Sequence, residues 1–313
     1  MREDFRRQGG LAIDVGRVDT ENPGPWGMLD LPRLTSSIVG VMRNGPDGTW
    51  AESIRPLVSY CYLGCSSVAH DADHAEGRMR LRRDMRTPAG LLAAPLGIAA
   101  LDTAGINVDP VHILSLTRID VHVLERASDV GEIRVVGRVV RRARTQVFSE
   151  ARIEDAAQPE RVIGLATADW AVMSPTPEGF IYTDPGHGVP DSASLPPLVE
   201  AFHGRPRPQR GFELPAVCPA VGSRVLHHGP IQVTLEATAL EVAAAKTERD
   251  EMRVEHLSTR IVKAGRVGPF ITSGEVVAAT SDTIACRSEL RDQGGNGCLV
   301  AVGLARLATA PLR

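Results

Sequence analysis

The feature that most constrains this 313-residue chain is an internal repeat. Short segments of the first half reappear in the second half in the same order. The matching pairs include Pro95-Leu-Gly-Ile with Pro230-Ile-Gln-Val, Thr117-Arg-Ile with Thr259-Arg-Ile, and Arg161-Val-Ile-Gly-Leu-Ala with Cys298-Leu-Val-Ala-Val-Gly. The spacing between partners drifts only between elements, where loops of different length are tolerated. Several ordered matches indicate a duplicated unit, so both copies should fold alike.

Each copy begins with a short strand and a long helix. The strands are predicted over Met79–Met85 and Phe212–Val217. The helices are predicted over Leu91–Asn107 and Ile231–Thr247, where Ala and Leu favour helix. Both predicted helices carry apolar residues on all of their faces, as is typical of a helix that is buried on all sides.

A run of β-branched segments follows each helix. In the first copy the expected strands are Leu114–Leu124, Gly131–Arg141, Val147–Asp155 and Val162–Val172, and in the second they are Glu255–Lys263, Phe270–Ala278, Thr283–Asp292 and Cys298–Leu307. Alternation of side chains in the second of these runs indicates a strand with one buried face. A strand, a helix and an antiparallel meander form an α+β order.

The repeat divides the chain into four parts. Residues 1–75 form an N-terminal extension that is only partly assigned, with a short apolar run at Leu57–Leu63. The two copies occupy residues 76–173 and 211–313. Residues 174–210 are rich in proline and are expected to form an extended linker.

Composition narrows the class of protein. The net charge of −3 offers no general electrostatic reason to expect a nucleic-acid partner or a membrane partner. No apolar segment is long enough to span a bilayer, and the charged start MREDFRRQGG is unlike a secretory signal. Five scattered cysteines lack the spacing of a zinc site and suggest free thiols in a reducing cytoplasm. We therefore expect a cytoplasmic protein without a metal.

The helix starts carry the residues that suggest chemistry. The first reads Ala93-Ala-Pro-Leu-Gly-Ile-Ala-Ala-Leu-Asp102-Thr103, and the second begins Leu226-His-His228-Gly229-Pro230. Both resemble the helix motif of phenylacetate-pathway (PaaI-like) thioesterases, within the 4-hydroxybenzoyl-CoA thioesterase superfamily: His-Gly-Gly, six variable residues, then Asp or Glu. The resemblance implies a tandem, or double, hotdog fold, in which each copy is a curled antiparallel sheet around a central helix. It also implies an acyl-CoA thioesterase with no cofactor beyond the CoA of its substrate.

The two copies depart from that motif in complementary ways. The first has Asp102 at the carboxylate position but Ala93-Ala94 in place of His-Gly, whereas the second has His228-Gly229 but Ala237 at the carboxylate position. In the family, the His-Gly of one unit faces the carboxylate of the other. The resemblance therefore implies one composite site between the copies and one emptied site.

The roles of the site residues follow from thioester chemistry. The amide of Gly229 would stabilise the developing oxyanion at a helix N-terminus, a position where Pro230 has no N–H to offer. His228 would orient or polarise the thioester, and Asp102 would act as general base or nucleophile. By the resemblance Thr103 would assist the water, and Glu236, one position from Ala237, would be a second catalytic acid if the alignment slips by one residue.

Other interpretations remain open. Asp102 could bond backbone at its helix, His228 could belong to an ordinary turn, and Thr103 could bond its own helix. The chain could also be a non-catalytic acyl-CoA-binding or partner hotdog protein, or a hotdog hydratase or dehydratase, and two double hotdogs could pair as a homodimer. The basic candidates for binding the phosphates of CoA are not ranked: Arg78, Arg80, Arg118, Arg141, Arg142 and Arg144.

Overall fold

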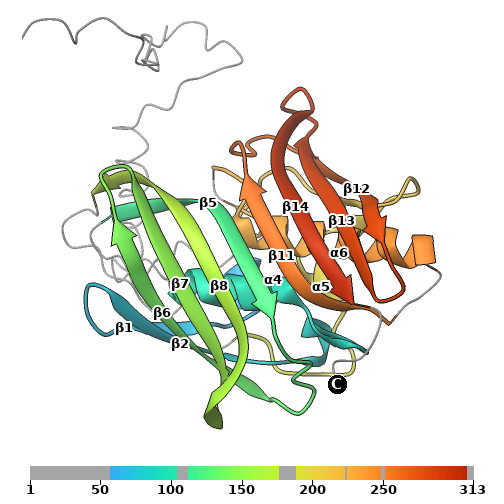
Figure 1. Ribbon diagram of the computed structural model, residues 1–313. Coiled ribbons are helices and arrows are strands. Elements are labelled where there is room, and N and C mark those ends of the chain that lie inside the picture. The colour runs from blue at the N-terminus through green and yellow to red at the C-terminus, as the bar shows by residue number, and fades with distance from the viewer. Residues whose placement is uncertain (1–56, 104–111, 176–187, 223, 248–250, 309–313) are drawn as a thin grey trace, which may run out of the picture.

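One antiparallel sheet dominates the computed structural model, which describes residues 57–103, 112–175, 188–222, 224–247 and 251–308 (Figure 1). Within these residues twelve strands run in the order β1-β2-β6-β7-β8-β5-β11-β14-β13-β12-β10-β9. The strands of the N-terminal half of the sheet are β1 (Ser66–Ala69), β2 (His74–Arg80), β5 (His112–Val123), β6 (Glu132–Arg142), β7 (Gln146–Asp155) and β8 (Gln158–Pro175). The remaining strands are β9 (Arg205–Pro206), β10 (Phe212–Leu214), β11 (Arg253–Ile261), β12 (Phe270–Ala279), β13 (Thr283–Asp292) and β14 (Cys298–Ala308). The predicted α+β class with a curled sheet in each copy is confirmed.

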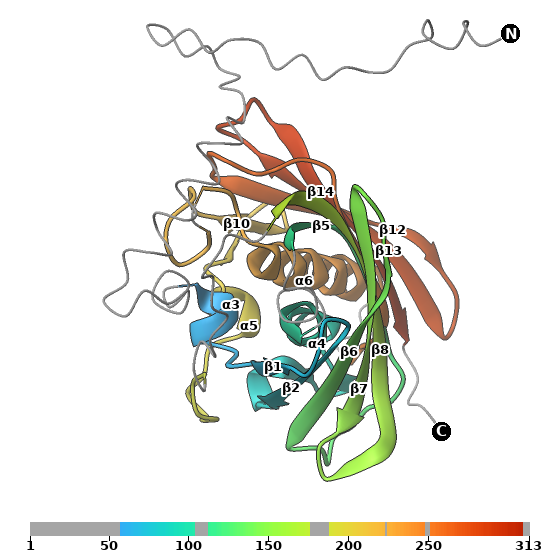
Figure 2. The same cartoon turned by 90° about the vertical axis from the view of Figure 1, so that its left-hand side faces the viewer.

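Two helices lie inside the curve of the sheet (Figure 2). In the first copy, α4 (Ala93–Leu101) is buried along its whole length. In the second copy, α6 (His228–Thr247) begins three residues before the expected start. Each has a proline at its third residue, where the missing N–H would have had no partner within the helix. Part of the predicted first helix, residues 104–107, lies outside the described residues. No helix in the described ranges is long and apolar enough to cross a membrane.

The two copies join through β5 and β11, which pair antiparallel and make the sheet continuous. In this pairing Arg118 lies directly opposite Arg260, its own counterpart in the repeat. The two helices also meet at equivalent positions. Gly97 of α4 lies against Gln232 of α6, its counterpart in the repeat, so closely that a Cβ added to Gly97 would lie 2.5 Å from Oε1 of Gln232. Equivalent residues that face one another at two places define a pseudo-two-fold axis between the copies.

The described residues that precede α4 also form structure. In the N-terminal part, α3 (Val58–Cys61) packs against α6, and β1 and β2 extend the sheet. The expected strand over Met79–Met85 ends early, because β2 stops at Arg80 and a 3₁₀ turn (Arg83–Met85) follows. Two short strands, β3 (Arg86–Thr87) and β4 (Gly90–Leu91), then lead into α4.

The proline-rich linker is not extended throughout. It contains α5 (Leu198–Ala201), which packs on α6, and the strand β9, which pairs with β10. Phe202, directly after α5, is fully buried. The expectation of a plain extended linker is therefore wrong for residues 198–206, since apolar side chains of this segment join the core.

Candidate active site

The start of α4 is held by a carboxylate from the other copy. Glu236, on α6, accepts a hydrogen bond from the amide of Ala93 at Oε1 (2.6 Å) and from the amide of Ala94 at Oε2 (3.0 Å). All three residues are buried. The first N–H groups of a helix have no partner within it and carry the positive end of its dipole, so a carboxylate fits there. Two backbone amides of the first copy, of the kind that could stabilise an oxyanion, are thus joined to a carboxylate of the second copy across the pseudo-two-fold axis.

Glu236 is adjusted to titrate near neutral pH. Burial raises its pKa to about 7, although the hydrogen bonds from Ala94 and Ala93 act in the opposite direction by favouring the ionised form. A carboxyl group with this pKa can take up and release a proton at neutral pH, as a general base requires.

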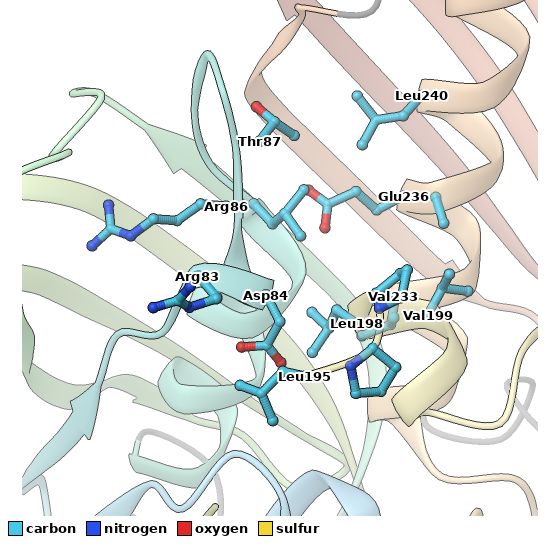
Figure 3. Close-up of a pocket in the computed structure, with 14 residues that line it drawn as sticks. Arg83, Asp84, Arg86, Thr87, Leu195, Leu198, Val199, Val233, Glu236 and Leu240 are labelled. Atoms are coloured by element: carbon cyan, nitrogen blue, oxygen red, sulfur yellow. The ribbon is translucent and has the colours of Figure 1, made fainter. Parts of the chain in front are cut away.

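A cavity of about 510 Å³ opens beside Glu236 (Figure 3). Its described lining comes from the 3₁₀ turn and β3, from the linker and from one face of α6. The apolar lining residues are Leu92, Leu195, Pro196, Pro197, Leu198, Val199, Val233, Ala237 and Leu240. A largely apolar cavity of this size, with a few polar groups, is typical of a small-molecule site.

The other charged residues of the lining are engaged elsewhere. The side chain of Arg83 pairs with Asp191 (3.1 Å), and Arg86 donates to the carbonyl of Ala127 (2.7 Å). Both guanidinium groups extend away from Glu236, whose carboxylate points toward the middle of the lining residues (Figure 3). Asp84 is held by Arg82 in a buried ion pair at 3.1 Å. Glu236 is therefore the acid best placed to meet a molecule in the cavity.

The start of α6 is built differently, because residues from other segments pack on it. Nδ1 of His227 is hydrogen-bonded to Oγ of Ser59 (2.9 Å), and the amide of Gly229 donates a longer bond to the same Nδ1 (3.5 Å). A Cβ on Gly229 would lie 2.0 Å from Oγ of Ser59 and 3.3 Å from the ring of Phe202. The amide predicted to be an oxyanion donor is thus turned toward the imidazole that precedes its own helix, in a closely packed place.

The ionisable groups near this end of α6 are held neutral by burial. The ring of His227 lies 3.9 Å from that of His228 and 5.5 Å from that of Tyr60. Burial lowers the pKa of His227 to about 4 and the pKa of His228 well below its usual value, and it raises the pKa of Asp102 far above its usual value. The pKa of Tyr60 is raised mainly by burial and further by the acidic groups of Asp102 and Cys65.

The structure places the predicted site residues in two groups. His228-Gly229 lies at the start of α6 beside His227, Ser59 and Tyr60, and Asp102 lies at the C-terminal end of α4, whereas Glu236 meets the start of α4. At Ala93-Ala94, where an emptied site was expected, Glu236 supplies a carboxylate. The hydroxyl of Thr103 donates to the carbonyl of Ala99 (2.9 Å), which is the bond within its own helix that was the alternative interpretation.

The sequence interpretation missed Ser59 and Tyr60, although both lie in the apolar run at Leu57–Leu63 that it had noticed. It also missed the linker residues of the cavity. None of the six arginines proposed to hold CoA is among the described residues that line this cavity, where the arginines are Arg83 and Arg86. Within the described part of the chain, no three His, Cys, Asp or Glu side chains gather as a metal site.

Comparison with known proteins identifies the fold. No protein-family model and no curated protein matches the sequence. Among solved structures, a TesB protein of Mycobacterium avium subsp. paratuberculosis superposes with a TM-score of 0.55 at 12% identity, over 78% of this chain and 96% of that one. A protein of Lactobacillus plantarum that is provisionally named an oleoyl thioesterase gives 0.51 at 11% identity, over 80% and 98%.

A third structure carries the name of the fold itself. It is a conserved protein of Alicyclobacillus acidocaldarius with a hot dog fold, which superposes with a TM-score of 0.51 at 13% identity, over 78% of this chain and 96% of that one. Similarity at such low identity defines architecture alone. Together with the repeat and the two helices that meet at equivalent positions, it shows that this chain is a tandem pair of hotdog units.

Proposed function

We propose that this protein hydrolyses an acyl-CoA thioester at the start of α4, with Glu236 as the general base. The observation that carries the proposal is the carboxylate of Glu236 on the amides of Ala93 and Ala94, beside an apolar cavity. The motif that resembles phenylacetate-pathway thioesterases and the thioesterase name of one structural neighbour support the same reaction class. The proposed enzyme acts in the cytoplasm and needs no cofactor beyond the CoA of its substrate.

The reaction uses donors that the resting protein already holds in place. The thioester carbonyl oxygen replaces a carboxylate oxygen of Glu236 at the amides of Ala93 and Ala94. Glu236 takes a proton from water as the water oxygen bonds to the carbonyl carbon, and the carbonyl electron pair moves to the oxygen that faces the amides. When the C–S bond breaks, the proton held by Glu236 passes to the leaving sulfur, which releases a free acid and CoA.

A panel of acyl-CoAs tests the proposal, with release of the free thiol as the measurement. Glu236→Gln keeps the size of the side chain but cannot accept the proton, so we expect kcat to fall by roughly 10²- to 10⁴-fold. The control is Glu160→Gln, which neutralises an exposed acid on β8 and should leave kcat unchanged. Full activity in Glu236→Gln, or no turnover of any acyl-CoA by the wild type, would overturn the assignment.

A non-catalytic role in binding acyl-CoA is the second candidate. It is favoured by one observation, namely that both amides at the start of α4 are already satisfied by Glu236. Calorimetric binding of acyl-CoA without release of thiol would support that role instead. Burst and steady-state measurements of thiol release then separate the two functions.

A further inference from the structure

The segment between the two hotdog units forms part of the wall of the cavity. Consecutive linker residues 195–199 all line it, together with Leu92, Val233 and Leu240. In Figure 3 the side chains of Leu195, Leu198 and Val199 lie together on one side of the space that Glu236 faces. This wall comes from a segment that has no counterpart within the repeated units.

The wall is fixed at its N-terminal side to the part of the chain that precedes α4. Asp191 accepts hydrogen bonds from the backbone amide of Arg83 (3.2 Å) and from its Nε (3.1 Å). Two residues earlier, the amide of Val189 donates to the carbonyl of Tyr62 (3.1 Å). Pro196 and Pro197 follow, and their rings restrict the backbone, so the wall has little freedom to move away.

Its C-terminal side is fixed to the second copy. Phe202 is fully buried, and its ring packs on the start of α6, where a Cβ added to Gly229 would lie 3.3 Å from it. A Cβ on Gly204 would lie 2.6 Å from Cγ2 of Val199 and 3.2 Å from Cγ2 of Thr234, so α5 is pressed closely onto α6. A wall held at both ends gives the cavity a defined depth.

We propose that Leu195 and Leu198 of this linker wall determine which acyl groups the site accepts, by limiting the length of an aliphatic chain. The inference rests on the proposed function, and it names the substrate class as straight or branched aliphatic acyl thioesters. The lining of the cavity near the wall is aliphatic. A water molecule takes about 30 Å³ in the liquid and a methylene group a similar volume, so about 510 Å³ has room for an aliphatic chain of at most about 17 carbons.

The test is the chain-length profile of kcat/KM over a series of straight-chain acyl-CoAs. Leu195→Ala and Leu198→Ala should move the preferred substrate toward longer chains, with kcat/KM for long relative to short chains raised roughly tenfold. Leu195→Phe should move the preference toward shorter chains. Leu165→Ala, which truncates an exposed leucine on the outer face of β8, is the matched control and should keep the wild-type profile.

Leu198 is buried and its loss can weaken the fold, so the half-buried Leu195 provides the independent readout. An unchanged profile in both Leu195 variants overturns the inference, provided that Glu236→Gln is inactive. If Glu236→Gln retains full activity, the chemistry has been placed at the wrong site and the proposed function fails first. A wild type that hydrolyses no acyl-CoA overturns both.

Discussion

The two central helices begin in opposite ways. The start of α4 consists of alanines, gives its free amides to an acid from the other copy and adjoins a cavity. The start of α6 has the sequence His-His-Gly, but the amide of Gly229 is directed at His227, and Ser59 and Phe202 cover this end of the helix. A helix N-terminus can therefore provide hydrogen-bond donors for a reaction through its backbone alone, provided that a cavity and an acidic side chain lie beside it.

The dependence of activity on pH is the most direct test of whether the start of α4, with Glu236, is the active one of the two helix starts. A general base acts only when ionised, so kcat/KM should rise about tenfold per pH unit and level off above pH 7, where the pKa of Glu236 lies. Two units below that value the rate should be about a hundredfold lower. The measurement is kcat/KM for one acyl-CoA across the range of pH in which the fold is stable. A midpoint near the ordinary value of a glutamic acid would point to an exposed acid instead.

The crowding at the start of α6 can be tested through stability. Gly229→Ala would place a methyl group 2.0 Å from Oγ of Ser59, so we expect the free energy of unfolding to fall by about 1–3 kcal/mol in urea titrations. Ser59→Gly in the same chain removes the obstructing hydroxymethyl group and should recover much of that loss. The equivalent change at α4, Ala94→Gly, should cost only about 0.5–1 kcal/mol. Equal losses of unfolding free energy in Gly229→Ala and Ala94→Gly would contradict the difference in packing between the two helix starts.

Asp102 gives the smallest expected change in activity. Asp102→Asn should lower kcat less than tenfold, because in our assignment the base is Glu236. Its effect should appear in stability: a carboxyl group whose pKa is raised on folding stabilises the fold at low pH, and that contribution is lost as the pH rises through the raised pKa. As the pH rises above the ordinary pKa of an aspartic acid, the variant should therefore lose less stability than the wild type in thermal melts. A loss of kcat as large as that in Glu236→Gln would move the site to α6.

Much of the fold could be predicted because the repeat makes each copy a check on the other. Alternating side chains located the strands of both meanders, and the observed bounds of β12, β13 and β14 lie within one residue of those expected. The earlier start of α6 was not predicted, since the residue before it is His227 rather than one of the usual capping residues. The expected homodimer of double hotdogs remains a prediction.

The site was harder to predict because it depends on how the two helices cross. A shift of one position decides whether Glu236 or its neighbour Ala237 faces the other helix, and the contact of Gly97 with Gln232 sets that register. Sequence matching alone cannot resolve one position on a helix that is apolar on all sides. Nor could it bring Ser59 to His227, since these residues are 168 positions apart in the chain.

That contact at the helix crossing has a further consequence for how such a protein can change. In a dimer of identical subunits, a residue on the symmetry axis meets itself, so Gly97 would face glycine and Gln232 would face glutamine. The first pair would leave a void, and the second would force two large polar side chains into one buried place. Only a chain that encodes the two halves separately can place a small residue on one helix against a large residue on the other at this axis. The same freedom lets one helix start acquire an acid and a cavity while the other is filled, and it ties each half to this particular partner.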